Sequence, residues 1–230
     1  VVVEEYVKGF DHRILVIGDR VVAVAKRLPA HVVGDGKHTI RELIEIENQN
    51  ELRGEGHELP LTKIRIDDDT LEMLRRQGYT LDSIPEEGKI VWLKSTANLS
   101  TGGVAIDVTD EIHPEIEMMA VRIARALSMD ICGIDVITVD ISKPLSESNL
   151  RVIEVNAAPG LRMHLYPYKG TPRPIGDAIV DFLFPDKSKY RMPIIAVTGT
   201  NGKTTTVRLI AHILRLAGYS VGYTTTDGIY

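Results

Sequence analysis

Short apolar runs separated by polar residues predict strands at the start of the chain. The runs Ile14–Ile17 and Val21–Ala25 are rich in β-branched residues and have the length of strands. Gly18 and Asp19 lie between them, and a two-residue turn of this kind joins antiparallel strands in a hairpin. Further strands are expected within residues 89–109, on both sides of a glycine-rich loop, and at residues 134–139 and 151–155.

Apolar residues with helical spacing occupy the segments between these strands. Thr39 and Glu42 have the spacing of a capping box, so a helix is expected to begin at Thr39. A short helix from about Asp69 to Gln77 and a longer one from Pro114 show the same period. This alternation of strands and helices predicts the α/β class.

A polar segment without periodicity divides the chain near residue 185. Residues 185–193 begin and end with proline, so we place a linker at residues 187–193. An apolar strand at Ile194–Val197, a glycine-rich turn, an amphipathic helix to about Ala217 and another strand follow. This order is that of the first βαβ unit of a parallel sheet. We therefore predict one domain over residues 1–186 and the start of a second over residues 194–230.

Composition narrows the class of protein. The 230 residues are 43% hydrophobic and carry a net charge of -5, which gives no electrostatic reason to expect nucleic acid. No apolar run approaches the roughly 18 residues of a membrane helix. One cysteine excludes an internal disulfide and fits a reducing cytoplasm. The chain opens with Val1 and lacks an initiator methionine, so we expect a fragment.

The turn at residues 198–205 carries the most specific local pattern. Glycines allow successive backbone N–H groups to point at phosphate oxygens, and a helix N-terminus adds positive charge. Lys203 would bridge the β- and γ-phosphates and the Thr204 hydroxyl would bind Mg²⁺. The expected nucleotide ligands are Gly199, Thr200, Asn201, Gly202, Lys203, Thr204 and Thr205. The alternative is an ordinary strand-to-helix turn.

That turn has only two residues between its glycines, Gly199 and Gly202, whereas the general phosphate loop has four. The shortened form resembles the Mur ligase family. The resemblance implies that a hydroxyl in the later segment 224–228 completes the magnesium shell. A threonine-rich strand end is the alternative there.

Three oxygen-bearing side chains lie on two successive predicted strands. Glu154 and Asn156 are two residues apart, so both project from one face of their strand. Asp135 on the preceding strand meets them if the two strands pair. Carboxylate and amide oxygens suit Mg²⁺ that carries nucleotide phosphates. Solvated strand ends are the alternative explanation.

The segment from Glu154 to Gly160 resembles the metal-binding strand of the ATP-grasp superfamily, with Asp135 in the place of the first ligand. The resemblance extends over residues 1–184. It implies that Glu4 and the backbone of Val7 hold adenine and that Asp11 reaches the ribose. Arg13 would face the phosphates. Surface positions for Glu4, Asp11 and Arg13 are the alternative.

A glycine-rich loop resembles the flexible loop that ATP-grasp ligases close over substrate. Its expected substrate ligands are Asn98, Ser100, Thr101, Gly102 and Gly103. A plain Gly-Gly hairpin is the alternative.

One position departs from the ATP-grasp pattern. The branch of D-alanine ligases has an arginine two residues before the first metal ligand, where this chain has Gly133. Arg162 is the expected replacement in stabilising an acyl phosphate.

An ATP-grasp module followed directly by a Mur-type module resembles the cyanophycin synthetase family. The resemblance implies ATP and Mg²⁺ as cofactors and amide bonds made through acyl phosphates. The first module would add aspartate to the backbone of a growing cyanophycin chain, and the second would add arginine to each aspartate side chain. We also expect a cytoplasmic homo-oligomer that binds neither nucleic acid nor membrane. Another ATP-grasp peptide ligase, similar to glutathione synthetase, and a non-catalytic nucleotide-binding protein are the alternatives.

Overall fold

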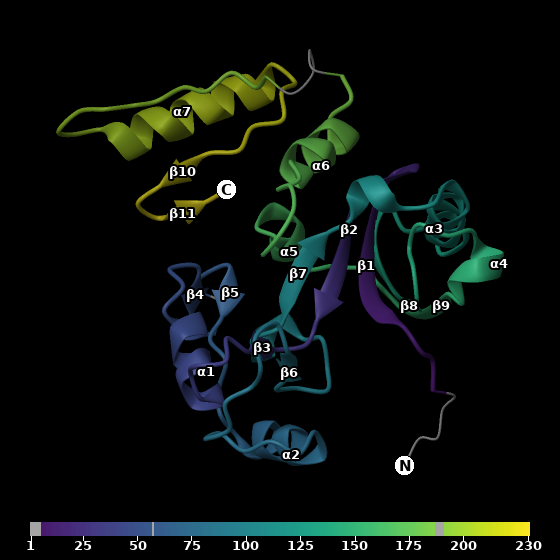
Figure 1. Ribbon diagram of the computed structural model, residues 1–230. Helices are drawn as coiled ribbons and strands as arrows, with labels where there is room; N and C mark the ends of the chain where they lie inside the picture. The colour runs from purple at the N-terminus through teal and green to yellow at the C-terminus, as the bar shows by residue number, and fades with distance from the viewer. Residues whose placement is uncertain (1–5, 57, 187–190) are drawn as a thin grey trace. The chain divides into compact units, whose positions relative to one another are not determined.

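The computed structural model describes residues 6–56, 58–186 and 191–230 (Figure 1). The chain divides into two compact units, Val1–Pro185 and Asp186–Tyr230, which are treated separately below. Glu4 and most of the predicted linker, residues 187–190, lie outside the described residues.

The first unit is built on an antiparallel sheet of five strands in the order β7-β2-β1-β8-β9. The bounds are β1 Phe10–Ile17, β2 Arg20–Leu28, β7 Val104–Asp107, β8 Ile131–Thr138 and β9 Arg151–Asn156. The predicted hairpin is confirmed, because β1 pairs with β2 across a turn at Gly18 and Asp19.

Helices cover the two faces of this sheet. Alternate residues of β1 point to opposite faces, so Ile14 and Val16 pack in one core while Leu15 and Ile17 pack in another. The first core includes α3 (Pro114–Ala126), and the second includes α6 (Ile175–Leu183). The short helix α5 (Arg162–Leu165) lies on the same side as α6 and contacts β2 and β7. The shorter helices are η2 (Thr109–Glu111) and α4 (Leu145–Ser148).

The chain between β2 and β7 forms a lobe with its own core, here called the insert lobe (residues 29–103). Its elements are β3 His31–Val33, α1 Ile40–Asn48, β4 Arg53–Gly54, β5 Leu61–Thr62, α2 Asp68–Arg76, β6 Ile90–Trp92 and η1 Leu99–Thr101. Ile40, Ile44 and Leu74 from the helices pack on Val91 and Leu93. The predicted capping box is confirmed, since Thr39 accepts from the Glu42 amide and the Glu42 side chain accepts from Thr39.

The second unit has one long helix, α7 (Lys203–Leu216), and a hairpin of β10 (Thr224–Thr225) and β11 (Gly228–Ile229). The predicted strand at Ile194–Val197 is absent from this described unit, and Ile194 is 87% exposed. A parallel strand requires a neighbour for its backbone groups, and none pairs with residues 194–197 here. The predicted strand after the helix is replaced by the short hairpin.

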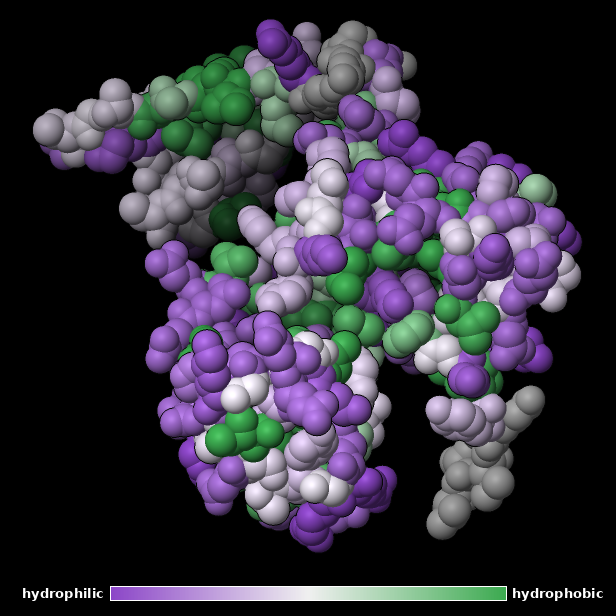
Figure 2. All heavy atoms as spheres, in the orientation of Figure 1, coloured by the Kyte–Doolittle hydropathy of each residue, from purple (hydrophilic) through white to green (hydrophobic). Residues whose placement is uncertain are grey.

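Apolar side chains of α7 remain exposed within the second unit. Leu209, Ile213 and Leu216 are each more than half accessible. Figure 2 shows hydrophobic atoms gathered along this helix. Such a stripe is typical of a helix that covers a sheet. Among the described helices, none is both long and apolar enough to span a membrane.

Candidate active sites

Two paired strands bring the predicted metal ligands together. β8 and β9 are antiparallel, and the Cα atom of Asp135 lies opposite that of Glu154. Gly133 lies opposite Asn156 in the same register. The Asn156 side-chain amide donates to Glu154 Oε1 at 2.9 Å. Residues directly opposite each other share one face of a sheet, so Asp135 and Glu154 are neighbours.

A bulge in β9 sets this register. Asp135 pairs with Glu154, whereas the next residue, Val136, pairs with Val152, so Ile153 has no partner. An extra residue of this kind shifts every later side chain by one position relative to the partner strand. The bulge therefore places Glu154, and not Ile153, opposite Asp135.

Asp135 lies in a chain of alternating charges on the sheet. Arg13 on β1 ion-pairs with Asp135 through Nε and donates from a second guanidinium nitrogen at 2.9 Å. Arg27 on β2 lies 3.0 Å from Oδ2 of Asp135, the oxygen that also accepts from Arg13 Nη2, and 2.5 Å from Oδ1 of Asp11. Two arginines thus alternate with two carboxylates across β2, β1 and β8.

Burial and the arginines act in opposite directions on these carboxyl groups. Burial raises the pKa of Asp135, but hydrogen bonds from Arg13 and the charge of Arg27 outweigh it, and the net pKa is below 3.8. For Asp11 burial is the larger effect, so its pKa is raised despite Arg27. The arginines thus favour the ionised form of Asp135, and a cation bound there would share its oxygens with Arg13 and Arg27.

The donor set fits Mg²⁺ bound together with a nucleotide. Among the described residues, no three His, Cys, Asp or Glu side chains group so as to hold a metal ion by themselves. Mg²⁺ commonly uses one or two carboxylates and takes its other ligands from phosphates and water. Asp135 and Glu154 supply two carboxylates. Asn156 would supply an amide oxygen, since the nitrogen end of its side chain donates to Glu154.

Gly133 leaves room that Arg13 fills. A Cβ atom at Gly133 would lie 2.8 Å from Arg13 Cδ and 2.7 Å from Pro159 Cβ. The arginine side chain therefore reaches the position beside Asp135 from the neighbouring strand. This explains how the site contains an arginine although position 133 is glycine.

Arg162, the predicted replacement, lies at the start of α5. Its guanidinium donates to the carbonyl of Leu59 in the insert lobe at 2.9 Å. Arg13 is the arginine that contacts Asp135. Between the two predicted catalytic arginines, the geometry favours Arg13 for a role beside the metal ligands.

The loop predicted to bind substrate, residues 98–103, is fixed at its base by its glycines. Gly102 has φ +94°, and a Cβ there would lie 2.8 Å from Ile64. A Cβ at Gly103 would meet the Asn98 carbonyl oxygen at 2.7 Å. Ser100 and Thr101 lie in the short helix η1, between its N-cap Asn98 and its C-cap Gly102. The glycines therefore allow close packing against the insert lobe, in addition to any mobility.

The glycine-rich turn at residues 198–205 precedes α7. Gly202 has φ +78° and is the N-cap residue, a conformation that glycine adopts without strain. Lys203 Nζ donates to the Gly199 carbonyl at 2.7 Å and lies 3.3 Å from the Thr200 carbonyl. The lysine thus lies over the turn, with its amine at the open end of the helix.

Three residues have surroundings that the sequence did not predict. Arg27 was not singled out, although it contacts two of the acidic residues. His164 on α5 is 2% exposed, and both its ring nitrogens lack a hydrogen-bond partner. Burial, followed by the charge of Arg13, lowers the His164 pKa to about 4, so the ring is neutral.

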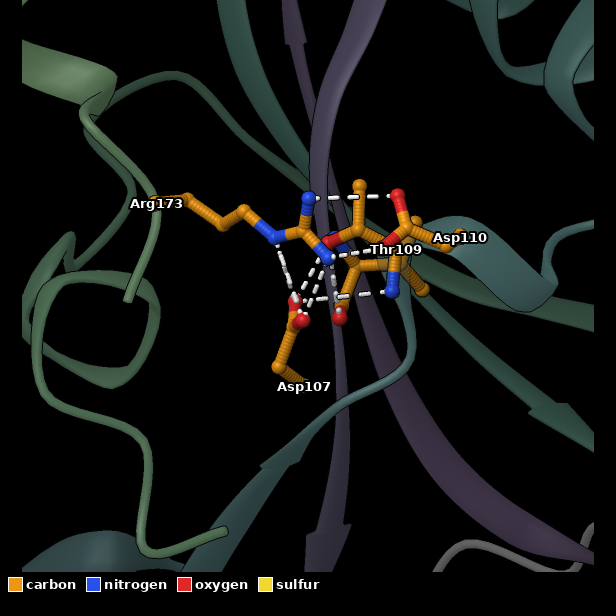
Figure 3. Close-up of polar contacts among 5 residues, drawn as sticks. Asp107, Thr109, Asp110 and Arg173 are labelled. Carbon is orange, nitrogen blue, oxygen red and sulfur yellow. Dashed lines mark hydrogen bonds and ion pairs between the residues drawn. The ribbon is translucent and has the colours of Figure 1, made fainter. Parts of the chain in front are cut away.

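Arg173 is the third of these residues. Figure 3 shows its guanidinium between Asp107 and Asp110, at 2.6 and 2.7 Å. The Arg173 amide also donates to the carbonyl of His164 at 2.9 Å. Arg173 therefore ties the segment after α5 to the end of β7. Nothing in the local pattern around Arg173 indicates this long-range contact.

Family models match both units. A model described as the RimK-like ATP-grasp domain matches residues 93–169, and one described as the Mur ligase middle domain matches residues 197–230. Cyanophycin synthetase from Crocosphaera subtropica is 57% identical over 230 residues, which is 100% of this chain and 26% of that protein. The chain resembles cyanophycin synthetases along its whole length. The enzyme of that name from a Synechocystis species is 55% identical over the same span.

A second group of relatives matches the first unit. The glutathione biosynthesis bifunctional protein GshAB from Listeria monocytogenes is 43% identical over 184 residues, 80% of this chain and 24% of that protein. The crystal structure of a bifunctional glutathione synthetase from Pasteurella multocida superposes with a TM-score of 0.70 at 39% identity. It covers 79% of this chain and 24% of that one. The fold of the first unit is thus that of an ATP-grasp domain, and the predicted fold class is confirmed.

The chain spans about a quarter of the length of its cyanophycin synthetase relatives, 26% in each case named above. The Mur-type domain is only partly present, with residues 197–230 matched.

Proposed function

We propose that the chain belongs to an ATP-dependent amide ligase of cyanophycin synthesis, with two nucleotide sites. The observation that carries the proposal is the order of the two matched domains, ATP-grasp first and Mur ligase middle domain second. Matches to the bifunctional glutathione enzymes cover about 80% of the chain, whereas those to cyanophycin synthetases cover all of it. The second unit therefore distinguishes the two groups.

The first site would phosphorylate the terminal carboxylate of a polymer chain, so that the amine of aspartate can displace phosphate. Asp135, Glu154 and Asn156 would hold Mg²⁺ on the ATP phosphates. When bound, Mg²⁺ neutralises charge on the transferring phosphoryl group. Arg13 donates to Asp135 from Nε and Nη2, and its Nη1 would donate to the acyl phosphate.

Adenine and substrate would lie on either side of these residues. The backbone of Val7, just before β1, would bind the adenine base together with Glu4. Asp11 would reach the ribose through the oxygen that Arg27 leaves open, since Oδ1 already accepts from Arg27 at 2.7 Å. Ser100 and Thr101 would donate to the substrate from the insert lobe.

The second site would phosphorylate the side-chain carboxylate of each added aspartate, so that arginine can attack it. Backbone amides from Gly199 to Gly202 would bind the phosphates at the positive end of α7. Lys203 would exchange its present carbonyl partners for the β- and γ-phosphates. The Thr204 hydroxyl and the segment 224–228 would complete the magnesium shell.

The whole protein would act as a cytoplasmic homo-oligomer on aspartate, arginine and a growing chain. ADP release by the full-length enzyme tests the division between the sites. With primer and aspartate alone, release should require Glu154 and survive Lys203→Ala. Release that depends on the added arginine should be lost in Lys203→Ala. Loss of the aspartate step in Lys203→Ala would contradict the assignment.

Glutathione formation is the second candidate, because the TM-score of 0.70 relates the first unit to a bifunctional glutathione synthetase. ADP release that ignores aspartate and arginine but responds to the precursors of glutathione would favour it.

A further inference from the structure

A positively charged cavity opens in the insert lobe beside the substrate loop. Its volume is about 310 Å³, which is at the lower end of the range for small-ligand sites. Its polar and charged walls come from Thr62, Lys63, Arg65, Asp67, Lys94, Ser100 and Thr101. Figure 2 shows mostly hydrophilic atoms on the surface of this lobe, at the lower left.

Three cationic side chains, Lys63, Arg65 and Lys94, and the carboxylate of Asp67 line this cavity. Lys94 is buried, with 7% of its side chain exposed, and it ion-pairs with Asp67. Asp67 is also the N-cap of α2 and accepts from the Thr70 amide at 3.0 Å. Its carboxylate therefore accepts hydrogen bonds from both Lys94 and Thr70. The Lys94 hydrogen bond outweighs the effect of burial and lowers the pKa of Asp67, which keeps the pair ionised.

The other two cations are accessible to a ligand. Arg65 pairs with Glu55 at 2.8 Å, but both side chains are well exposed, and exposed pairs of this kind are weak and exchange readily. Lys63 is half-buried at the cavity wall. An anion in the cavity would therefore meet Lys63 and Arg65 with little competition from within the lobe.

The wall of the cavity is rigidly built. Arg53, whose side chain is 1% exposed, donates to the carbonyls of Thr62 at 2.6 Å and Gly102 at 3.2 Å. These bonds join the strand that precedes Lys63 to the loop that carries Ser100 and Thr101. The close contact of Gly102 with Ile64 adds to the same junction. The hydroxyls and the cations are therefore held on one surface.

We propose that this cavity binds carboxylates of the chain that the ATP-grasp site extends, in which each arginine joined to an aspartate side chain keeps a free α-carboxylate. Carboxylates accept charge-assisted bonds from lysine and arginine, and the hydroxyls of Ser100 and Thr101 add neutral donors. Nucleotide phosphates are the other anions at hand. The lining residues all come from the insert lobe, and β8 and β9, which carry the metal ligands, contribute none of those described. The assignment rests on the proposed aspartate-adding function.

The test uses the full-length enzyme and two residues outside the lobe core, the half-buried Lys63 and the exposed Arg65, each replaced by alanine. Lys89→Ala is the matched control, since Lys89 is exposed on the same lobe and lies outside the cavity lining. In each cavity variant the KM for a primer of arginine-bearing aspartate units should rise about tenfold or more, as expected for a lost charged hydrogen bond, with the KM for ATP unchanged. Lys94→Met should raise it further.

A direct titration keeps this test independent of turnover. A fluorescent primer of three arginine-bearing aspartate units should bind wild-type enzyme more tightly than Lys63→Ala, and the same primer with its arginine carboxylates amidated should not distinguish the two. A rise in the KM for ATP with unchanged peptide binding would assign the cavity to phosphate and overturn the proposal. Equal peptide binding by wild type, Lys63→Ala and Arg65→Ala would also overturn it. If wild type binds the peptide but releases no aspartate-dependent ADP, the proposed function fails and the cavity assignment stands.

Discussion

Replacing Gly133 with alanine places a methyl group where two side chains already lie. The new Cβ would be 2.7 Å from Pro159 Cβ and 2.8 Å from Arg13 Cδ, whereas carbon atoms in contact are normally about 3.5–4.0 Å apart. The overlap is close to 1 Å with each neighbour. Arg13 is held near this position by its paired bonds to Asp135, and Pro159 lies three residues beyond the end of β9.

The expected cost of Gly133→Ala follows from this geometry. Overpacking a filled site typically costs about 1–3 kcal/mol of unfolding free energy. Denaturant unfolding measures this loss of unfolding free energy, and the rate of aspartate-dependent ADP release reports the displacement of Arg13. We expect a loss of stability in that range together with a fall in the aspartate step.

Gly160→Ala is the matched control for that experiment. Gly160 lies in the segment that follows β9, next to Pro159. Its φ lies outside the left-handed region, and nothing lies within 4 Å of a Cβ placed there. Equal stability and equal ADP release in the two variants would refute the packing of Arg13 against Gly133.

The remaining predictions concern the insert lobe and the buried histidines. Arg53→Leu should speed hydrogen exchange at the Gly102 and Gly103 amides, because the bond to the Gly102 carbonyl is lost; unchanged exchange would show that the glycine contacts alone fix the loop. Thr39→Ala should cost about 1 kcal/mol of unfolding free energy through loss of the helix cap, and no change in a urea titration would contradict the capping box. His12 and His164 have pKa values lowered by burial to about 4, so the unfolded chain binds more protons than the folded one between about pH 6.5 and 4. Stability should therefore fall as pH drops through this window, by up to about 1.4 kcal/mol per pH unit for each histidine, and His164→Gln should make the fall shallower. An unchanged pH slope in that variant would count against a neutral, buried His164.

The sequence predicts local structure here better than it predicts register. The hairpin at Gly18 and the helix cap at Thr39 depend on neighbouring residues alone, and both were predicted. Counting back from the hairpin turn would place Lys26 opposite Asp11. A shift between Leu15 and Val16 instead places Arg27 there. The bulge at Ile153 decides in the same way which residue faces Asp135. The position of a bulge is determined by packing across the sheet, which cannot be deduced from a single sequence.

Long-range contacts were the other source of error. The contact of Arg13 with Gly133 was not predicted, because it follows only from the pairing of β1 with β8. The strand expected at residues 194–197 satisfies its local pattern and still lacks a neighbouring strand in the described unit. A strand is stable only with a partner, so local pattern alone could not decide it.

The most direct test of two independent nucleotide sites is the stoichiometry of a non-hydrolysable ATP analogue on the full-length protein, measured by calorimetry with Mg²⁺ present. Wild type should bind two equivalents per chain, and Lys203→Ala and Glu154→Ala should each bind one. The double variant should bind none. A single equivalent on wild type, or loss of both equivalents in either single variant, would contradict two separate sites.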